Sequence, residues 1–244
     1  MLNEFLSDNH VSPKVIYTYF EEEQLAEFMV YSKDCAKAEN RTLGKFKFIE
    51  NKETKNSDPS NTKPGISYKY FGESSSHPDK RSGLGFCTWG DGSTYQGHWE
   101  TDKKHGMGTE NWKDGANYWG EFKQGLKHGN GEFAWANEDV YSGEFKNNQI
   151  EGNGTYEWAD GRVYTGSWAN NKMHGTGKFC WMNGGVYEGD YVNDVKEGKG
   201  TFTWKDGKKY TGQWKDGKEH GNGVFISAKG DTIEGRWKNG EIVK

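Results

Sequence analysis

Residues 164–168 read Tyr-Thr-Gly-Ser-Trp, and this phrase, Tyr-x-Gly-x-aromatic, returns along the chain every 23 residues. The other copies begin at Tyr95, Tyr118, Tyr141, Tyr187, Tyr210 and, in a weaker form, Ile233. A constant period of this size is typical of a repeat array, in which one unit cannot bury its own apolar face and must stack on its neighbours. Fold and function therefore both have to be read from the repeated unit.

A second phrase, His-Gly-x-Gly, follows the first at a constant distance. It begins at His105, His128, His174 and His220, and Glu151 and Glu197 replace the histidine in two further units. Gly-rich loops are able to cradle anions, but this phrase recurs in every unit, has no helix after it and accepts Glu in place of His. We therefore interpret it as a tight loop whose His or Glu satisfies backbone groups, and not as a metal, phosphate or catalytic site.

Together with the Asp-Gly pairs that stand between the units, these two phrases resemble the MORN repeat (membrane occupation and recognition nexus). The resemblance covers roughly residues 68–244. It implies a protein-interaction array, because MORN arrays occur in ciliary radial-spoke heads, at cell junctions and in parasite cytoskeletal collars, often within assemblies of several subunits.

Alternation along the unit predicts β-strands. Tyr164, Gly166 and Trp168 share one face of a first strand, and Phe179 and Trp181 share one face of a second. The pairs between units predict type I′ turns, in which both central residues have positive φ, and they stand at Asp91-Gly92, Asp114-Gly115, Asp160-Gly161, Asn183-Gly184 and Asp206-Gly207. Asn137-Glu138 departs from this pattern and predicts a local irregularity. The expected fold is mainly β, an elongated, curved, single-layer antiparallel meander of hairpins with a short N-terminal helical extension.

A shift in composition divides the chain. All 11 Trp lie at or beyond Trp89, and only two of the 35 Gly precede residue 66. We expect an N-terminal extension over residues 1–65 and the array over 66–244, with a degenerate first unit at 70–92, regular units from 95 and a partial last unit at 233–244. In the extension, the spacing of apolar residues predicts a helix over about 19–39 and a strand over about 45–50, followed by a linker.

Several classes of function are disfavoured by the sequence. A net charge of -4 without a basic stripe argues against a nucleic-acid-binding protein. No grouping of nucleophile, base and oxyanion donors, no nucleotide-binding loop and no metal cluster is found, so we expect neither an enzyme nor a cofactor. Three cysteines without metal-ligand spacing are typical of free thiols in a reducing compartment. No apolar run is long enough to span a bilayer. We expect a cytoplasmic or cytoskeletal location, with the ciliary or flagellar axoneme as the specific hypothesis.

The aromatic face of the sheet is the candidate site. Because a single sheet has no second layer, its rings must stack on one another or contact a partner; we expect rings at the floor of a trough to be structural and those at its walls to be available. A helix or an extended segment of another protein is the expected ligand, and the helix at 19–39 is a candidate in cis. The candidate residues are Tyr95, Trp99, Trp112, Tyr118, Phe122, Phe133, Trp135, Tyr141, Phe145, Tyr156, Trp158, Tyr164, Trp168, Phe179, Trp181, Tyr187, Tyr191, Phe202, Trp204, Tyr210 and Trp214.

The leading hypothesis is thus a non-enzymatic scaffold within an assembly of several subunits, such as the radial-spoke head. The sequence is compatible with a homo-oligomer and with a hetero-oligomer. The alternative is an adaptor for phosphoinositide membranes, which the family's name implies. It needs basic residues clustered on one surface, and the residues that offer this are Lys205, Lys208, Lys209, Lys215, Lys218, Arg236 and Lys238. A third hypothesis, an accessory region of a lipid kinase or methyltransferase, ranks last because the chain ends at Lys244.

Overall fold

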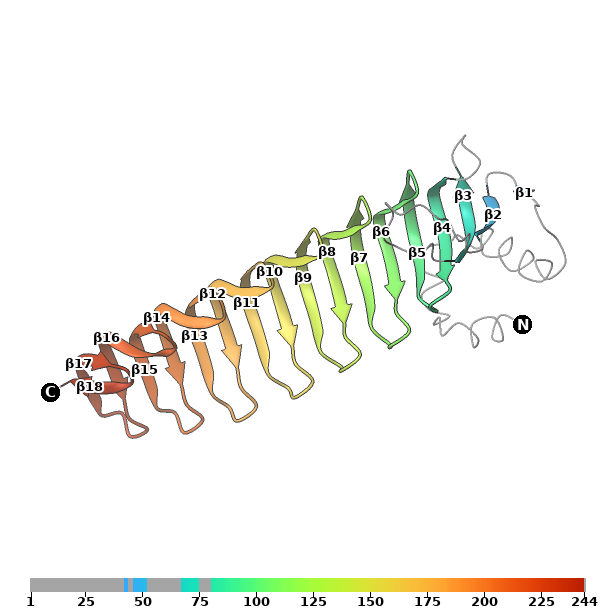
Figure 1. The fold of residues 1–244 in the computed structure, drawn as a ribbon. Coiled ribbons are helices and arrows are strands. Elements are labelled where there is room, and N and C mark those ends of the chain that lie inside the picture. The colour runs from blue at the N-terminus through green and yellow to red at the C-terminus, as the bar shows by residue number, and fades with distance from the viewer. Residues whose placement is uncertain (1–41, 44–45, 52–66, 75–79, 244) are drawn as a thin grey trace, which may run out of the picture. The chain divides into compact units, whose positions relative to one another are not determined.

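The computed structural model describes residues 42–43, 46–51, 67–74 and 80–243 (Figure 1). The chain forms two compact units, residues 1–126 and residues 127–244. This division falls within the repeats, whereas the boundary after residue 65 that composition predicts remains a prediction. The predicted helix at 19–39 and the predicted linker lie outside the described residues.

The first unit is an antiparallel meander, in which each strand pairs with the strand that follows it along the chain. The sequence predicts a strand at about 45–50, and the structure has a strand at Phe46–Asn51. The strands of the first unit are β1 (Thr42–Leu43), β2 (Phe46–Asn51), β3 (Tyr68–Ser74), β4 (Arg81–Trp89), β5 (Thr94–Glu100), β6 (Lys103–Asn111) and β7 (Asn117–Lys123). The predicted degenerate first repeat therefore forms a strand pair, β3 and β4, with Gly72 opposite Gly85 as in the regular copies.

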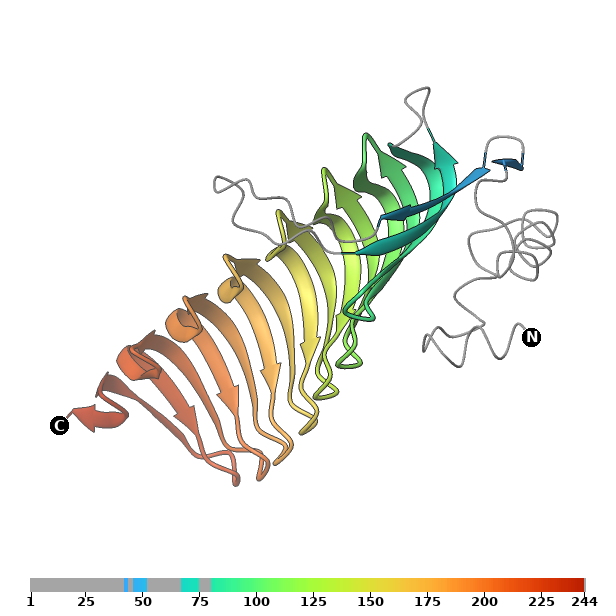
Figure 2. The same ribbon diagram turned by 45° about the vertical axis from the view of Figure 1, so that its right-hand side comes forward.

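The second unit continues this pattern, again with every strand antiparallel to the next. Seven-residue strands alternate with nine-residue strands. The connection that follows each seven-residue strand and the connection that follows each nine-residue strand lie at opposite edges of the sheet (Figure 2). The strands are β8 (Leu126–Ala134), β9 (Val140–Lys146), β10 (Gln149–Glu157), β11 (Val163–Ala169), β12 (Lys172–Cys180), β13 (Val186–Val192), β14 (Val195–Thr203), β15 (Lys209–Lys215), β16 (Lys218–Ile226), β17 (Thr232–Lys238) and β18 (Glu241–Val243). The expected single-layer antiparallel meander is confirmed within each unit.

The two-residue turns lie inside the repeats, between the seven-residue strand and the nine-residue strand that follows it. Asn170 and Asn171 connect β11 to β12 with φ of 51° and 63°, the positive pair that a type I′ turn requires. Asn171 also joins neighbouring repeats, since its N–H donates to Ile150 O at 3.0 Å and its Oδ1 accepts the Ile150 N–H at 2.7 Å. Asn suits this position because it tolerates positive φ and supplies a side-chain acceptor.

The prediction of type I′ turns at the Asp-Gly pairs is wrong. At Asp160-Gly161 only the glycine has positive φ, 82°. Gly161 N–H donates to Trp158 O at 2.8 Å, and Trp158 N–H donates to Arg162 O at 2.9 Å. This is a three-residue connection, a turn followed by a left-handed residue, which Asp-Gly also favours. The structure places these connections between the repeats, where the sequence predicts a change of direction, but with a different geometry.

The irregularity predicted at Asn137-Glu138 is also absent. Glu138 N–H donates to Trp135 O at 3.0 Å, and Trp135 N–H donates to Asp139 O at 2.9 Å, as in the other connections. Glu138 itself takes the left-handed conformation, with φ of 70°. The hydrogen bonds of the strands on either side enforce the turn even though a non-glycine residue occupies the strained position.

The His-Gly-x-Gly phrase forms no loop, contrary to its interpretation as one. It lies within the nine-residue strands, at a bulge where the pairing register shifts between Gly166 and Trp168 and where Gly175 has φ of 77°. The expected contact with backbone groups is present for the two glutamates. Glu151 accepts the N–H of Asn170 at 3.1 Å, and Glu197 accepts that of Asp216 at 2.9 Å.

The core of each unit is a row of tyrosines that cover a row of glycines. Tyr164 is fully buried, and its hydroxyl donates to Ser167 O at 3.0 Å. Gly166 lies opposite Gly177, and a Cβ on Gly166 would lie 2.5 Å from the Gly177 Cα and 2.6 Å from the Tyr164 hydroxyl oxygen. The Tyr164 ring therefore packs directly against the glycine backbone. The Trp168 ring contacts it in a T-shaped arrangement, with the two ring centroids 5.0 Å apart. This packing buries an aromatic core without a second layer.

Candidate functional site

The structure divides the predicted aromatic residues by depth. Those on the seven-residue strands, together with Phe179, form the core and offer no accessible surface. They are Tyr95, Trp99, Tyr118, Phe122, Tyr141, Phe145, Tyr164, Trp168, Phe179, Tyr187, Tyr191, Tyr210 and Trp214, each at most 6% exposed. The remaining predicted rings, Trp112, Phe133, Trp135, Tyr156, Trp158, Trp181, Phe202 and Trp204, are half-buried.

In the second unit the half-buried rings, together with the buried Phe179, form one continuous row, which we call the aromatic rail. Each nine-residue strand contributes a Phe or Tyr near its end, and a Trp two residues later opens the connection that follows. The rail consists, in order, of Phe133, Trp135, Tyr156, Trp158, Phe179, Trp181, Phe202, Trp204 and Phe225. Sequence reasoning missed Phe225, because Ser227 replaces the expected Trp; its place in the repeat, 23 residues after Phe202, was the available signal.

Neighbouring rings along the rail touch one another at nearly constant intervals. The centroids of Tyr156 and Trp158 lie 4.5 Å apart, those of Trp158 and Phe179 5.2 Å apart, and those of Phe179 and Trp181 4.3 Å apart. Their planes meet at 35° to 40°, so the rings are tilted and not stacked face to face. The rail is therefore a corrugated apolar strip in which one Trp recurs with every repeat.

Asp139 anchors the first part of the rail. Its Oδ2 accepts the Tyr156 hydroxyl at 2.9 Å and its Oδ1 accepts the Ala159 N–H at 2.8 Å. Burial acts to raise the pKa of Asp139, but these hydrogen bonds outweigh it and lower the pKa. Burial, together with the hydrogen bond to this carboxylate, raises the pKa of Tyr156. The pair thus holds the Tyr156 ring and the following connection in place.

Lys196 lies among several rings at once, and the sequence reading did not anticipate it. The Lys196 Nζ is 4.4 Å from the Trp214 ring centroid, 5.1 Å from that of Phe202 and 5.7 Å from that of Trp181. Burial lowers the pKa of this ammonium, and the negative charge of Glu219 partly offsets the effect. Among the described residues no carboxylate forms an ion pair with Lys196. Its charge is balanced mainly by the electron-rich faces of the rings.

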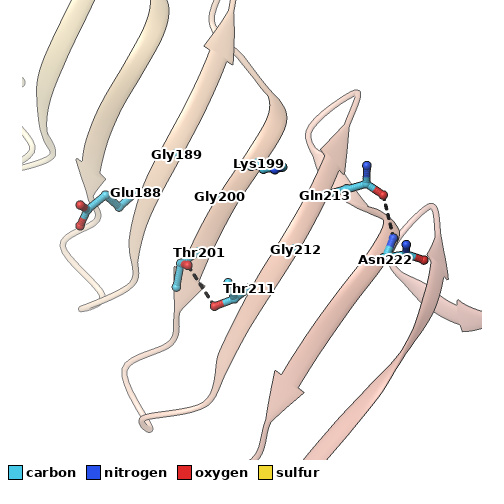
Figure 3. Close-up of a pocket in the computed structure, with 9 residues that line it drawn as sticks. All are labelled: Glu188, Gly189, Lys199, Gly200, Thr201, Thr211, Gly212, Gln213 and Asn222. Atoms are coloured by element: carbon cyan, nitrogen blue, oxygen red, sulfur yellow. Dashed lines mark hydrogen bonds between the residues drawn. The ribbon is translucent and has the colours of Figure 1, made fainter.

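The opposite face of the second unit is polar. A shallow, open depression there is lined by Glu188, Gly189, Lys199, Gly200, Thr201, Thr211, Gly212, Gln213 and Asn222 (Figure 3). Its side chains satisfy one another, since the Thr201 and Thr211 hydroxyl oxygens lie 3.0 Å apart and Gln213 Oε1 accepts the Asn222 N–H at 2.8 Å. This face offers no aromatic surface and serves below as a control.

The basic residues proposed for lipid contact are all exposed but lie at both ends of the strands. Lys205 and Lys208 stand in the connection after β14, where Lys208 pairs with Asp206 at 2.8 Å. Lys215 lies opposite Lys218 at the other end of β15. Arg236 lies beside the polar depression, and Lys238 lies opposite Glu241. Lys209, at the start of β15, completes a set that does not gather at one place.

Within the described part of the chain there is no cluster of His, Cys, Asp and Glu residues that could hold a metal ion. Nor do the described residues contain a helix with the length and apolar character that a membrane crossing requires.

Comparison with known proteins supports the repeat assignment. The family model of the MORN repeat matches seven segments of this chain, residues 79–94, 95–116, 118–140, 141–161, 164–186, 187–209 and 210–232. A search of the curated proteins finds no match.

Solved structures show only distant likeness. The TCP domain of SAS-4 from Drosophila melanogaster, solved with a proline-rich motif of Ana2, has a TM-score of 0.41 and 11% identity over 66% of this chain and 92% of that one. The TCP10 domain of CPAP from Danio rerio has a TM-score of 0.34 and 12% identity over 71% and 91% of the two chains. Likeness at these scores says nothing about function.

Proposed function

Because this chain belongs to the MORN-repeat family, we propose that it is a non-enzymatic scaffold that holds other proteins, with the aromatic rail of its second unit as the binding surface. The rail is the observation that carries the proposal. Burial of aromatic rings drives most protein association, and Trp and Tyr are the residues that most often dominate binding energy. Four Trp here are half-buried along one edge of a single-layer sheet, although the same sheet completely buries the tyrosine that opens each repeat, namely Tyr141, Tyr164, Tyr187 and Tyr210.

The specific setting that we propose is the radial-spoke head of the ciliary axoneme. Its support is the resemblance of the repeats to MORN arrays of that assembly. The same proposal covers a cytoskeletal location and an assembly of several subunits.

An adaptor for phosphoinositide membranes is the alternative that the test must separate from a scaffold. Its seven basic residues are exposed but divided between the two ends of the strands. Pelleting with vesicles that contain phosphatidylinositol bisphosphate, in parallel with vesicles of phosphatidylcholine alone, measures this directly. Binding only to the first, lost when Lys205, Lys215 and Lys218 are changed to Gln, would favour the adaptor.

The scaffold is tested by comparing the partners of three forms of the full chain in extract from ciliated cells. The forms are wild type, a rail variant with Trp158→Ala and Trp181→Ala, and a polar-face control with Thr201→Val and Thr211→Val. We expect quantitative mass spectrometry to show proteins that the wild type and the control retain and the rail variant loses, and purified partners to reproduce the difference. An identical set of proteins for all three folded forms would refute the rail as the binding surface.

A further inference from the structure

The rail repeats with a spacing that restricts the conformation of whatever lies along it. One Trp recurs every second strand, from Trp135 through Trp158 and Trp181 to Trp204. With strands about 4.8 Å apart, equivalent Trp residues are separated by about 9.6 Å. A ligand that uses the whole rail must present equivalent groups at that interval, on one side, for three intervals.

A polyproline II helix meets this requirement. It has three residues per turn and rises about 3.1 Å per residue, so every third side chain points the same way at about 9.3 Å. Over three intervals it falls out of register with the Trp row by only about 1 Å. A proline at every third position would therefore place one pyrrolidine ring against each Trp in succession.

The other regular conformations fit less well. An α-helix returns to the same face after seven residues, about 10.5 Å, and would drift by about 3 Å across the three intervals. A β-strand presents the same face about every 6.7 Å, which does not match the Trp spacing. Aromatic-lined grooves are also the surfaces on which proline-rich segments dock, because the segment is already ordered and loses little entropy on binding.

Lys196 adds a requirement for charge. Its ammonium lies among Trp181, Phe202 and Trp214, is shielded from water and forms no ion pair within the described residues. A half-buried cation that contacts rings but forms no ion pair favours a ligand that brings a carboxylate. The acidic group would belong between the residues that contact Trp181 and Trp204.

We propose that the aromatic rail binds a polyproline II segment that carries proline at every third residue and an acidic residue that pairs with Lys196. The inference rests on the proposed function, whose partner class it names. The Trp row selects the proline spacing, and Lys196 selects the position of the acidic residue.

The test uses full-length protein and a ten-residue peptide with proline at its first, fourth, seventh and tenth positions. Glutamate at the third and eighth positions serves either direction of binding. A second peptide has the same composition but carries its prolines at the first, fifth, sixth and tenth positions, so that no two successive prolines are three residues apart. A third peptide replaces both glutamates of the first by glutamine. We expect calorimetry to show binding of the first peptide, and about tenfold weaker binding or none for the second.

Protein variants assign the contacts. Trp158→Ala with Trp181→Ala should weaken the first peptide about tenfold or more, whereas the polar-face control Thr201→Val with Thr211→Val should leave it unchanged. Lys196→Gln should remove the difference between the glutamate and glutamine peptides, which tests the ion pair separately from the apolar contact. Circular dichroism of each variant confirms that it folds.

Equal affinity for the two proline spacings, no measurable binding of either, or binding that the rail variant leaves unchanged would overturn the inference. An amphipathic helical peptide with leucine at heptad spacing provides the distinction from the proposed function. If this peptide binds wild type but not the rail variant, the rail still binds proteins and only its ligand class is wrong. If the rail variant also retains all the partners that the wild type binds in extract, the proposed function fails as well.

Discussion

Replacing Gly166 by Ala tests the core packing on which the sheet depends. The new Cβ would lie 2.5 Å from Gly177 Cα, 2.6 Å from Thr176 O and 2.6 Å from the Tyr164 hydroxyl oxygen, all shorter than real contacts allow. Two of these atoms are backbone, so the strands or the Tyr164 ring must move. Overpacking of this kind costs about 1–3 kcal/mol, and loss of the hydrogen bond from Tyr164 to Ser167 O adds about 1 kcal/mol.

We therefore expect Gly166→Ala to lower the free energy of unfolding by about 2–4 kcal/mol and Tm by roughly 5–15 °C. The matched control is Thr165→Val, one residue away on the exposed polar face, which should change stability by about 0.5 kcal/mol or less. Both are measured by urea denaturation followed by circular dichroism. Adding Tyr164→Phe to Gly166→Ala removes the hydroxyl oxygen that the new methyl group meets, so the two changes should be less than additive. Equal stability of the two single variants would show that the Tyr164 ring does not lie over Gly166.

Three further outcomes follow from the turns and the tyrosines. Glu138→Gly should stabilise the protein by about 0.5–1 kcal/mol in urea denaturation, because relief of the left-handed strain at Glu138 exceeds the entropy cost of glycine; a loss of stability would contradict the strained φ. Asn171→Ala should lower the free energy of unfolding by about 2 kcal/mol, because it leaves the Ile150 N–H without its side-chain acceptor and places Ala at positive φ. Asn171→Gly should lower it less, since glycine adopts positive φ without strain; equal losses would argue against turn strain. Burial raises the pKa of Tyr164 and of Tyr210 to about 12. Their neutral form is favoured in the folded state, so this stability is complete below pH 10 and lost between about pH 10 and 12. The part of the absorbance rise at 295 nm that Tyr164→Phe with Tyr210→Phe removes should therefore appear only as the protein unfolds, and its appearance near pH 10 in folded protein would refute the burial.

The sequence was sufficient for the features that depend on local alternation. Tyr164, Gly166 and Trp168 share a face because side chains alternate along any strand, and the 23-residue period follows from the stacking of identical units. Turn geometry was not predictable in the same way. Asp160-Gly161 suits both a two-residue turn and a three-residue connection, and the choice depends on which backbone groups the flanking strands pair. The Asn pair at 170–171 carried the better signal, because Asn tolerates the positive φ that both positions need.

Depth was the second property that the sequence could not provide. Tyr164 and Trp158 look equivalent in the repeat, but the tyrosine covers glycines in the middle of its strand while the tryptophan stands beyond the end of β10. Only the pairing of strands shows which ring is enclosed. Lys196 was overlooked for a related reason. The equivalent residues one and two repeats earlier are Met173 and Ile150, although Lys127 and Lys104 occupy this position in the two repeats before those, so the charge is present in only some repeats.

The hydrogen bonds that Asn171 makes to Ile150 bear on how the array comes apart. Asp194 repeats them one unit later, where its N–H donates to Met173 O at 2.9 Å and its Oδ1 accepts the Met173 N–H at 2.8 Å. At the next two turns the residue is Gly217 or Gly240, and only the backbone bond to the preceding repeat remains. In a linear array, the strength of each junction sets how far a local opening spreads. Within the second unit, the junctions nearest residue 244 are therefore the weaker ones, and local opening of that unit should begin there. Amide hydrogen exchange should be fastest in β16 to β18 and should slow toward β12, so that the array melts directionally.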